Sequence, residues 1–229
     1  MPNLHPLTRI RAFWLWTAIA LGGVLTFLAV PGAYGVKAHA VLHGLCAQTP
    51  SHTFMFGGTA LPFDARMTGI YGGMFAWGRL RYDVVALLAL CVVAMGLDGT
   101  NSLLKDLGLW HPYPPANILR LVTGFGTGVA LAVILTWLLA SSMWNLASEK
   151  PVIRSFGDLR GVAFGGVLFG IAVLSGAGWL YLPISVLLMV SAWLTLTVLM
   201  LVVVLLLFRI DERVRTLEDL HIPGAAAAV

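Results

Sequence analysis

The feature that most constrains the fold is a run of 48 residues, Gly161 to Phe208, that contains no charged side chain. A helix needs about 20 mostly apolar residues to cross the hydrocarbon core of a bilayer. The run is therefore long enough for two crossings. Glycine and proline interrupt it at Ser175–Gly178 and Pro183, where a turn is favoured. The sequence predicts two membrane spans here, over 160–181 and 184–208.

Composition supports a membrane location for the whole chain. Hydrophobic residues make up 59% and charged residues 10% of the 229 residues, with a mean hydropathy of +0.90. Soluble domains are nearer half apolar and a quarter charged. This composition excludes a soluble globular enzyme, a disordered tail and a disulfide-rich secreted module. The basic residues are scattered between apolar runs, so they do not indicate nucleic-acid binding.

The middle of the chain is less regular than its ends. The segments 64–79 and 83–98 have 16 residues each, which is short for a full crossing. They are interpreted as two short spans, with a re-entrant or broken pair as the alternative. The predicted fold is an all-α bundle of about six spans in one transmembrane domain, residues 1–229. Its spans cover 12–36, 64–79, 83–98, 118–142, 160–181 and 184–208.

The distribution of basic residues predicts the orientation of this bundle in the cell membrane. Cytoplasmic segments carry an excess of Lys and Arg. With both termini in the cytoplasm, ten basic residues lie inside and four outside. The outer loops are then 37–63 and 99–117, and 209–229 is a cytoplasmic tail. The four outer basic residues are Lys37, Arg66, Lys105 and Arg120.

A possible metal site is indicated in the first outer loop. His39, His43 and Cys46 have i, i+4 and i, i+3 spacing, which places them on one side of a helix. Imidazole and thiolate are ligands for zinc or copper, and His52 or Asp64 would complete four. The alternative is that these are ordinary interfacial residues beside a short amphipathic helix.

A second group of polar residues lies at the predicted outer face. Asp64 and Arg66 precede the second span, Asp98 ends the third, and Asn117 and Arg120 begin the fourth. These groups have three interpretations. They are ion pairs that lock the bundle, they line a pathway for a small ion, or their arginines grip a phosphate or carboxylate.

Glycines recur at four-residue spacing in several predicted spans. Such small-xxx-small pairs let helix backbones approach closely. We interpret them as packing contacts within the bundle rather than as a dimer signal. The pairs are Gly69 and Gly73, Gly124 and Gly128, Gly161 and Gly165, and Gly166 and Gly170.

The motifs over residues 40 to 130 resemble a known family. These motifs are Cys46-x-Gln48, Arg66-x-x-Gly-Ile-Tyr71, Asp98-Gly99 and Asn117-x-x-Arg120-x-x-Thr-Gly. The resemblance is to prokaryotic polytopic membrane proteins catalogued as a domain of unknown function. It implies a multi-pass membrane protein without an established activity. Family members carry a His after the first Cys and a second Cys two residues before the Arg, where this chain has Ala47 and Asp64.

The function favoured by these patterns is binding or passage of a small ion, metal or anionic solute at the extracytoplasmic face. The alternatives are a membrane enzyme acting on a lipid headgroup or phosphate, and a non-catalytic subunit of a membrane complex. Motifs for nucleotide use are absent from the sequence. The predicted ligand-binding residues are Gln48, Asp64, Arg66, Tyr71, Asp98, Asn101, Asn117 and Arg120.

Overall fold

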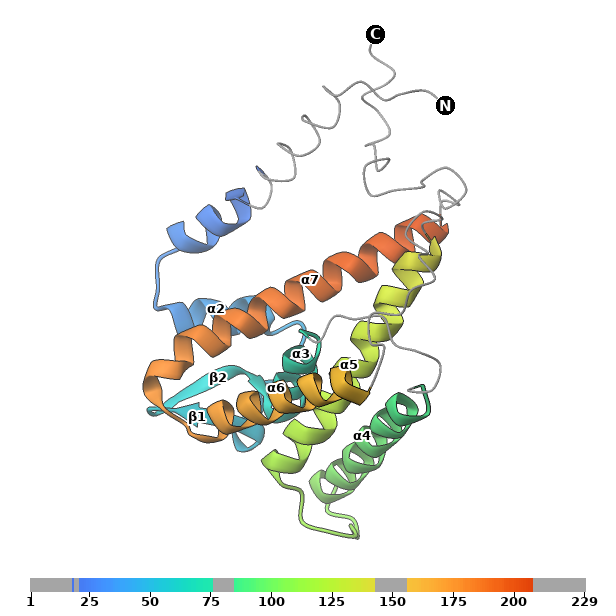
Figure 1. The fold of residues 1–229 in the computed structure, drawn as a ribbon. Coiled ribbons are helices and arrows are strands. Elements are labelled where there is room, and N and C mark those ends of the chain that lie inside the picture. Colours follow the sequence, from blue (N-terminus) through green and yellow to red (C-terminus); the bar gives the residue numbers. More distant parts are fainter. Residues whose placement is uncertain (1–17, 19–20, 76–84, 143–155, 208–229) are drawn as a thin grey trace, which may run out of the picture.

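The computed structural model describes residues 18, 21–75, 85–142 and 156–207 (Figure 1). These residues form helices and one two-stranded sheet. Within them, three helical stretches are long and apolar enough to cross a membrane: Leu88–Asp106, Asn117–Leu138 and Gly178–Val203. The prediction of a mostly helical membrane protein is therefore confirmed. The further crossings, and the cytoplasmic placement of both termini, stay predictions.

The described part of the first predicted span, 12–36, is not one continuous helix. Residues 21–29 are helical, and a separate helix, α2 (Tyr34–Leu42), follows. Pro31 and Gly32 separate them, with Gly32 at a φ of +131° that side chains disfavour. Lys37 Nζ donates hydrogen bonds to the carbonyl oxygens of Phe27 and Val30, at 2.9 and 3.0 Å. The lysine thereby satisfies carbonyls that the end of the first helix leaves unpaired.

The predicted outer loop 37–63 is largely folded, and it contains the sheet that an all-α prediction missed. After α2 come a short 3₁₀ helix, η1 (Pro50–His52), and the antiparallel strands β1 (Thr53–Phe56) and β2 (Thr59–Asp64). Gly57 and Gly58 both have positive φ, as a two-residue hairpin turn requires. The turn residue Gly57 donates its N–H to the Gly176 carbonyl at 3.0 Å.

The hairpin leads directly into a short buried helix, α3 (Ala65–Gly73). Nine residues extend about 14 Å, less than half of the roughly 30 Å hydrocarbon core, so α3 does not cross a membrane by itself. Most of its residues are buried in protein. Residues 76–84, which include the end of the predicted span 64–79, lie outside the described residues. The choice between two full spans and a re-entrant pair therefore stays a prediction.

The third and fourth predicted spans correspond to α4 (Val85–Asp106) and α5 (Asn117–Ser142). The helix α5 matches the predicted 118–142. In contrast, α4 continues eight residues past Asp98, so residues 99–106, which the sequence analysis placed in an outer loop, are helical. Its polar last turns are accommodated because their side chains find hydrogen-bond partners. Thr100 Oγ1 donates to the Gly96 carbonyl, and Asn101 Nδ2 donates to the Tyr113 carbonyl, both at 2.9 Å.

The long uncharged run forms α6 (Phe156–Leu174), a short 3₁₀ helix η3 (Gly178–Leu180) and α7 (Tyr181–Leu207). The predicted interruption at 175–178 is present, and Gly176 has a φ of +61°. Pro183 does not interrupt the chain as predicted, because it lies in the first turn of α7, where proline's missing N–H costs no helical hydrogen bond. The predicted tail 209–229 lies outside the described residues.

Glycines hold α3 and α5 together at backbone contact. A methyl group added to Gly69 would meet the Leu121 carbonyl, and one added to Gly128 would meet the Ile70 carbonyl. Gly73 and Gly124 are equally enclosed by the facing backbone. By contrast, added methyl groups at Gly161 and Gly165 of α6 would meet nothing within 4 Å. The first two predicted glycine pairs thus pack within the molecule, whereas no described residue packs against the pair at 161 and 165.

The main hydrophobic core lies beside this contact, where β2, α2 and α3 pack against α7, with α6 near the hairpin (Figure 1). Its centre is almost fully buried: Phe56, Leu61, Phe63, Val173 and Leu188. The core therefore attaches the hairpin to the helices at the same end of the molecule where α4 ends and α5 begins.

The glycine contact predicts a specific difference in stability. Replacing Gly128→Ala forces the backbones of α3 and α5 apart and should lower the free energy of unfolding by about 1–3 kcal/mol. Gly165→Ala is the matched control and should not destabilise, since its position is open and alanine favours helix. Thermal unfolding of the purified protein in detergent measures both. Equal midpoints for the two variants would contradict the close packing of α3 on α5.

Candidate functional site

Three segments that are distant in the sequence meet at one end of the molecule. Asn117 Nδ2, in the first turn of α5, donates to the Ser51 carbonyl of η1 at 3.3 Å. His52 Nε2 lies 3.9 Å from Asp106 Oδ1, at the end of α4. The segment around residue 51 therefore sits against both the end of α4 and the start of α5.

A polar cavity of about 320 Å³ lies where these segments meet. It combines two cationic side chains with one carboxylate and one imidazole. Burial lowers the pKa of His52 below its ordinary value, and the nearby Arg120 lowers it further, while Asp106 acts in the opposite direction. The lining residues are Ser51, His52, Lys105, Asp106, Pro115, Asn117 and Arg120.

Arg120 is the most buried charge in this lining, with 5% of its surface exposed. Its Nη1 donates a hydrogen bond to Asn117 Oδ1 at 2.8 Å, one turn earlier on α5. Within the part of the chain that the structure describes, no carboxylate lies within 4.0 Å of its guanidinium. The arginine is therefore held in place by a neutral amide and directed at the cavity without an ion-pair partner.

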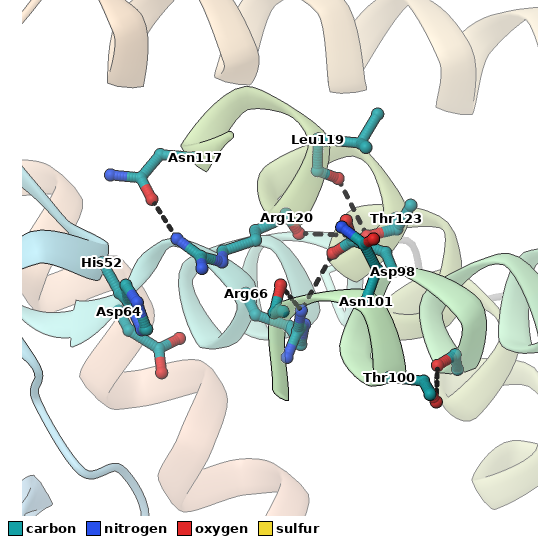
Figure 2. Close-up of polar contacts among 12 residues, drawn as sticks. His52, Asp64, Arg66, Asp98, Thr100, Asn101, Asn117, Leu119, Arg120 and Thr123 are labelled. Carbon is teal, nitrogen blue, oxygen red and sulfur yellow. Dashed lines mark hydrogen bonds and ion pairs between the residues drawn. The ribbon is translucent and has the colours of Figure 1, made fainter. Parts of the chain in front are cut away.

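The other arginine of the predicted site, Arg66, is neutralised. Its Nη2 lies 2.8 Å from Asp98 Oδ2 and 3.4 Å from Ser102 Oγ, so it joins α3 to α4. Asp98 is 1% exposed, and its second oxygen accepts a hydrogen bond from the Tyr113 hydroxyl at 3.2 Å. Figure 2 shows Arg66 directed to Asp98 and Arg120 directed to Asn117 from neighbouring helices.

Asn101 extends this buried network to the segment that connects α4 and α5. Its Nδ2 donates to the Tyr113 carbonyl at 2.9 Å, and its Oδ1 accepts from the Tyr113 N–H at 3.4 Å. Tyr113 is thus held by both Asn101 and Asp98. The network of Arg66, Asp98, Asn101 and Tyr113 positions the connection that borders the cavity, but these residues do not line it.

The remaining predicted ligand residues have structural contacts. Asp64 caps α3, because its Oδ1 accepts the Met67 N–H at 2.8 Å. Gln48, at a φ of +53°, donates from Nε2 to the carbonyls of His39 and Pro62. The ring of Tyr71 packs on Phe63 with a centroid distance of 4.8 Å. Of the predicted ligand residues, only Asn117 and Arg120 line the cavity.

The proposed zinc or copper ligands are separated in the structure. His39 Nε2 lies 3.2 Å from the Ala60 carbonyl oxygen, His43 is exposed after α2, and His52 lies at the cavity. Cys46 Sγ accepts the backbone N–H groups of Gln48 and Asp64, and burial raises the pKa of its thiol. Across the described ranges, no three His, Cys, Asp or Glu residues are grouped to hold a metal.

Sequence reasoning missed Ser51, Lys105 and Asp106 as members of a shared site. Lys105 and Asp106 are a charged pair in the polar segment that follows the apolar stretch 84–97, and such a pair indicates a position at the membrane surface. That signal was available. The proximity of Ser51 to Asn117, 66 positions away, had no sequence signal.

The long apolar helices define a membrane protein. Its polar cavity lies where α4 ends and α5 begins. Residues 46–134 match a family described as "Predicted membrane protein (DUF2085)". An uncharacterized protein from Methanothermobacter thermautotrophicus is 31% identical over an alignment of 99 residues, and the match covers 39% of this chain and 83% of that protein. The chain belongs to this family. No solved structure matches it.

All seven cavity residues fall within the matched range. The range also contains Cys46 and Asp64, two positions that the sequence analysis singled out. The backbone nitrogen of Asp64 lies 3.4 Å from Cys46 Sγ. Cys46 and Asp64 are therefore neighbours in space. Cys46 carries the thiol, and Asp64 caps α3.

The Arg66–Asp98 pair predicts a large effect of removing one charge. Asp98→Ala should lower the free energy of unfolding by about 2–4 kcal/mol, because it strands the arginine between α3 and α4. This is less than for a fully enclosed pair, since a quarter of the Arg66 side chain is exposed. Asp106→Ala, whose side chain is half exposed, should cost less than about 1 kcal/mol. If the two variants lost equal thermal stability, the buried Arg66–Asp98 pair would contribute no more to stability than the half-exposed Asp106.

Proposed function

We propose that this membrane protein binds a small anionic solute in the cavity between η1, α4 and α5. The observation that carries the proposal is Arg120, a cation that is 95% buried, lines the cavity and has no ion pair among the described residues. A buried charge without a partner is costly, and the cost falls when an opposite charge or water enters the site. An anion in the cavity supplies the missing charge.

The rest of the lining favours an anion over a cation. Lys105 and Arg120 contribute two positive charges against the single carboxylate of Asp106. The cavity also adjoins the N-terminus of α5, where the helix dipole is positive. The amide of Asn117 and the hydroxyl of Ser51 add neutral hydrogen-bonding groups beside the cations. Together these groups suit a carboxylate or phosphate oxyanion.

Binding is better supported than the enzyme alternative. That alternative assigned Asp64 or Asp98 as a catalytic base or metal ligand. Instead, Asp64 accepts the capping N–H of Met67, and Asp98 is bonded to Arg66 and Tyr113. These contacts give both carboxylates a structural explanation. No specific contact among the described residues favours passage of a solute or a role as a non-catalytic subunit of a membrane complex.

For topology, we propose a multi-pass protein of six spans in the cell membrane, with both termini cytoplasmic and the cavity on the outer face. The ten-to-four distribution of basic residues supports this orientation. The cavity residue Lys105 and the α4–α5 connection then face outward. In this arrangement the bilayer is the protein's principal partner.

Cysteine labelling tests the orientation. In a variant without native cysteines, Leu109→Cys, which lies in the α4–α5 connection and is exposed, should react with a membrane-impermeant maleimide on intact cells. Lys150→Cys should react only after the cells are opened. Reaction of position 150 in intact cells would contradict the proposed topology.

Anion binding is tested by calorimetry on the purified full chain in neutral detergent, with phosphate, sulfate and acetate as separate probes. At least one should bind saturably, and Arg120→Gln should weaken it tenfold or more by removing the buried charge. Arg160→Gln removes an exposed arginine of α6 outside the cavity lining and should leave binding unchanged. If neither these three anions nor the phosphatidic acid used in the next subsection bound saturably, the proposed function would be refuted.

A further inference from the structure

We infer that the anion is a phosphate group, presented to the cavity by a phospholipid headgroup at the outer membrane surface. The inference rests on the proposed function and adds the class of ligand. It depends on three observations about the cavity: its place along the spans, the apolar surface beside it, and its size.

The cavity lies where two candidate membrane spans end. Lys105 and Asp106 are the last two residues of α4, and Asn117 is the first residue of α5. The stretches able to cross the bilayer, Leu88–Asp106 and Asn117–Leu138, end and begin at these same residues. The cationic lining is therefore at the level where hydrocarbon gives way to headgroups. Lipid phosphates occupy that level in any bilayer.

Apolar side chains are exposed directly beside the charged lining. Leu107, Leu109 and Trp110 follow Asp106 in the chain and are 63%, 54% and 81% exposed. Leu103 on α4 and Ile118 on α5 are also more than half exposed. Exposed Trp beside span ends is typical of membrane interfaces. A free aqueous anion needs no such surroundings, whereas a lipid places acyl chains along them while its phosphate reaches the cavity.

The size and chemistry of the cavity fit a headgroup. Its volume of about 320 Å³ is about ten times the ~30 Å³ share of one water molecule. This is more than a monatomic ion fills. Arginine presents parallel N–H donors that match two oxygens of a phosphate, and lysine adds a point charge. A phosphate group meets Arg120 and Lys105 with oxygens at several positions, while the planar carboxylate of a short acid offers two.

The experiment compares probes on the purified full chain in neutral detergent, by calorimetry. The probes are dihexanoyl phosphatidic acid, glycerol 3-phosphate, inorganic phosphate and dihexanoylglycerol, which lacks the phosphate. We expect dihexanoyl phosphatidic acid to bind at least tenfold more tightly than the two water-soluble phosphates, and dihexanoylglycerol to bind weakest.

Two variants test the cationic lining. Lys105→Gln changes an exposed position and leaves packing intact, and Arg120→Lys keeps the charge but loses the forked guanidinium. Each should weaken the binding of phosphatidic acid at least threefold. Arg160→Gln should not.

The outcomes separate the two proposals. Equal affinity for inorganic phosphate and phosphatidic acid, with the same loss in Arg120→Gln, would overturn the lipid source and leave anion binding intact. Binding of phosphatidic acid that Lys105→Gln and Arg120→Lys do not change would show attachment through acyl chains alone and would also overturn the inference. If no phosphate probe and no other anion binds, both proposals fail.

Discussion

The contact between α3 and α5 is the constraint from which the rest of this structure follows. Glycines on both helices remove the side chains that would hold the backbones apart, so carbonyl groups of one helix lie against the glycine α-carbons of the other. Close approach places Arg66 beside Gly124, one turn from Arg120. It also fixes the end of the hairpin, because Asp64 is both the last residue of β2 and the cap of α3. A helix too short to cross a bilayer by itself is thereby held as part of the protein interior.

The two neighbouring arginines differ in what surrounds them. Arg66 reaches α4, where Asp98 is buried and already holds the Tyr113 hydroxyl, so its charge serves to join helices. Among the residues that the structure describes, the Arg120 side chain reaches only the amide of Asn117, and it is a cation at the wall of a cavity. We expect removal of a charge from the first site to weaken the fold, and removal of the charge from the second to weaken binding of the proposed anion. The proposed function depends on this difference and not on the number of charges at this end of the molecule.

Hydropathy alone predicted α5 and the break between α6 and α7 closely, because an uncharged helical stretch and a glycine turn are local properties. It ended α4 too early, at Asp98, because a carboxylate and the polar residues after it are usually outside the bilayer. Here Asn101 and Ser102 are buried by partners that lie elsewhere in the chain. The hairpin was missed for a related reason. Its strands are only four and six residues long, and their stability comes from packing on α2 and α7 rather than from their own pattern.

The sequence by itself determined that this protein belongs in a membrane, where its long apolar helices lie, and which polar residues collect near their ends. It also identified the family, through motifs that are continuous in the chain. Only the tertiary structure decided how those polar residues are divided between a buried network and a cavity. The physical reason is that hydropathy and helical spacing act over a few neighbouring residues, whereas the pairing of Arg66 with Asp98 and the meeting of Ser51 with Asn117 join positions 32 and 66 residues apart.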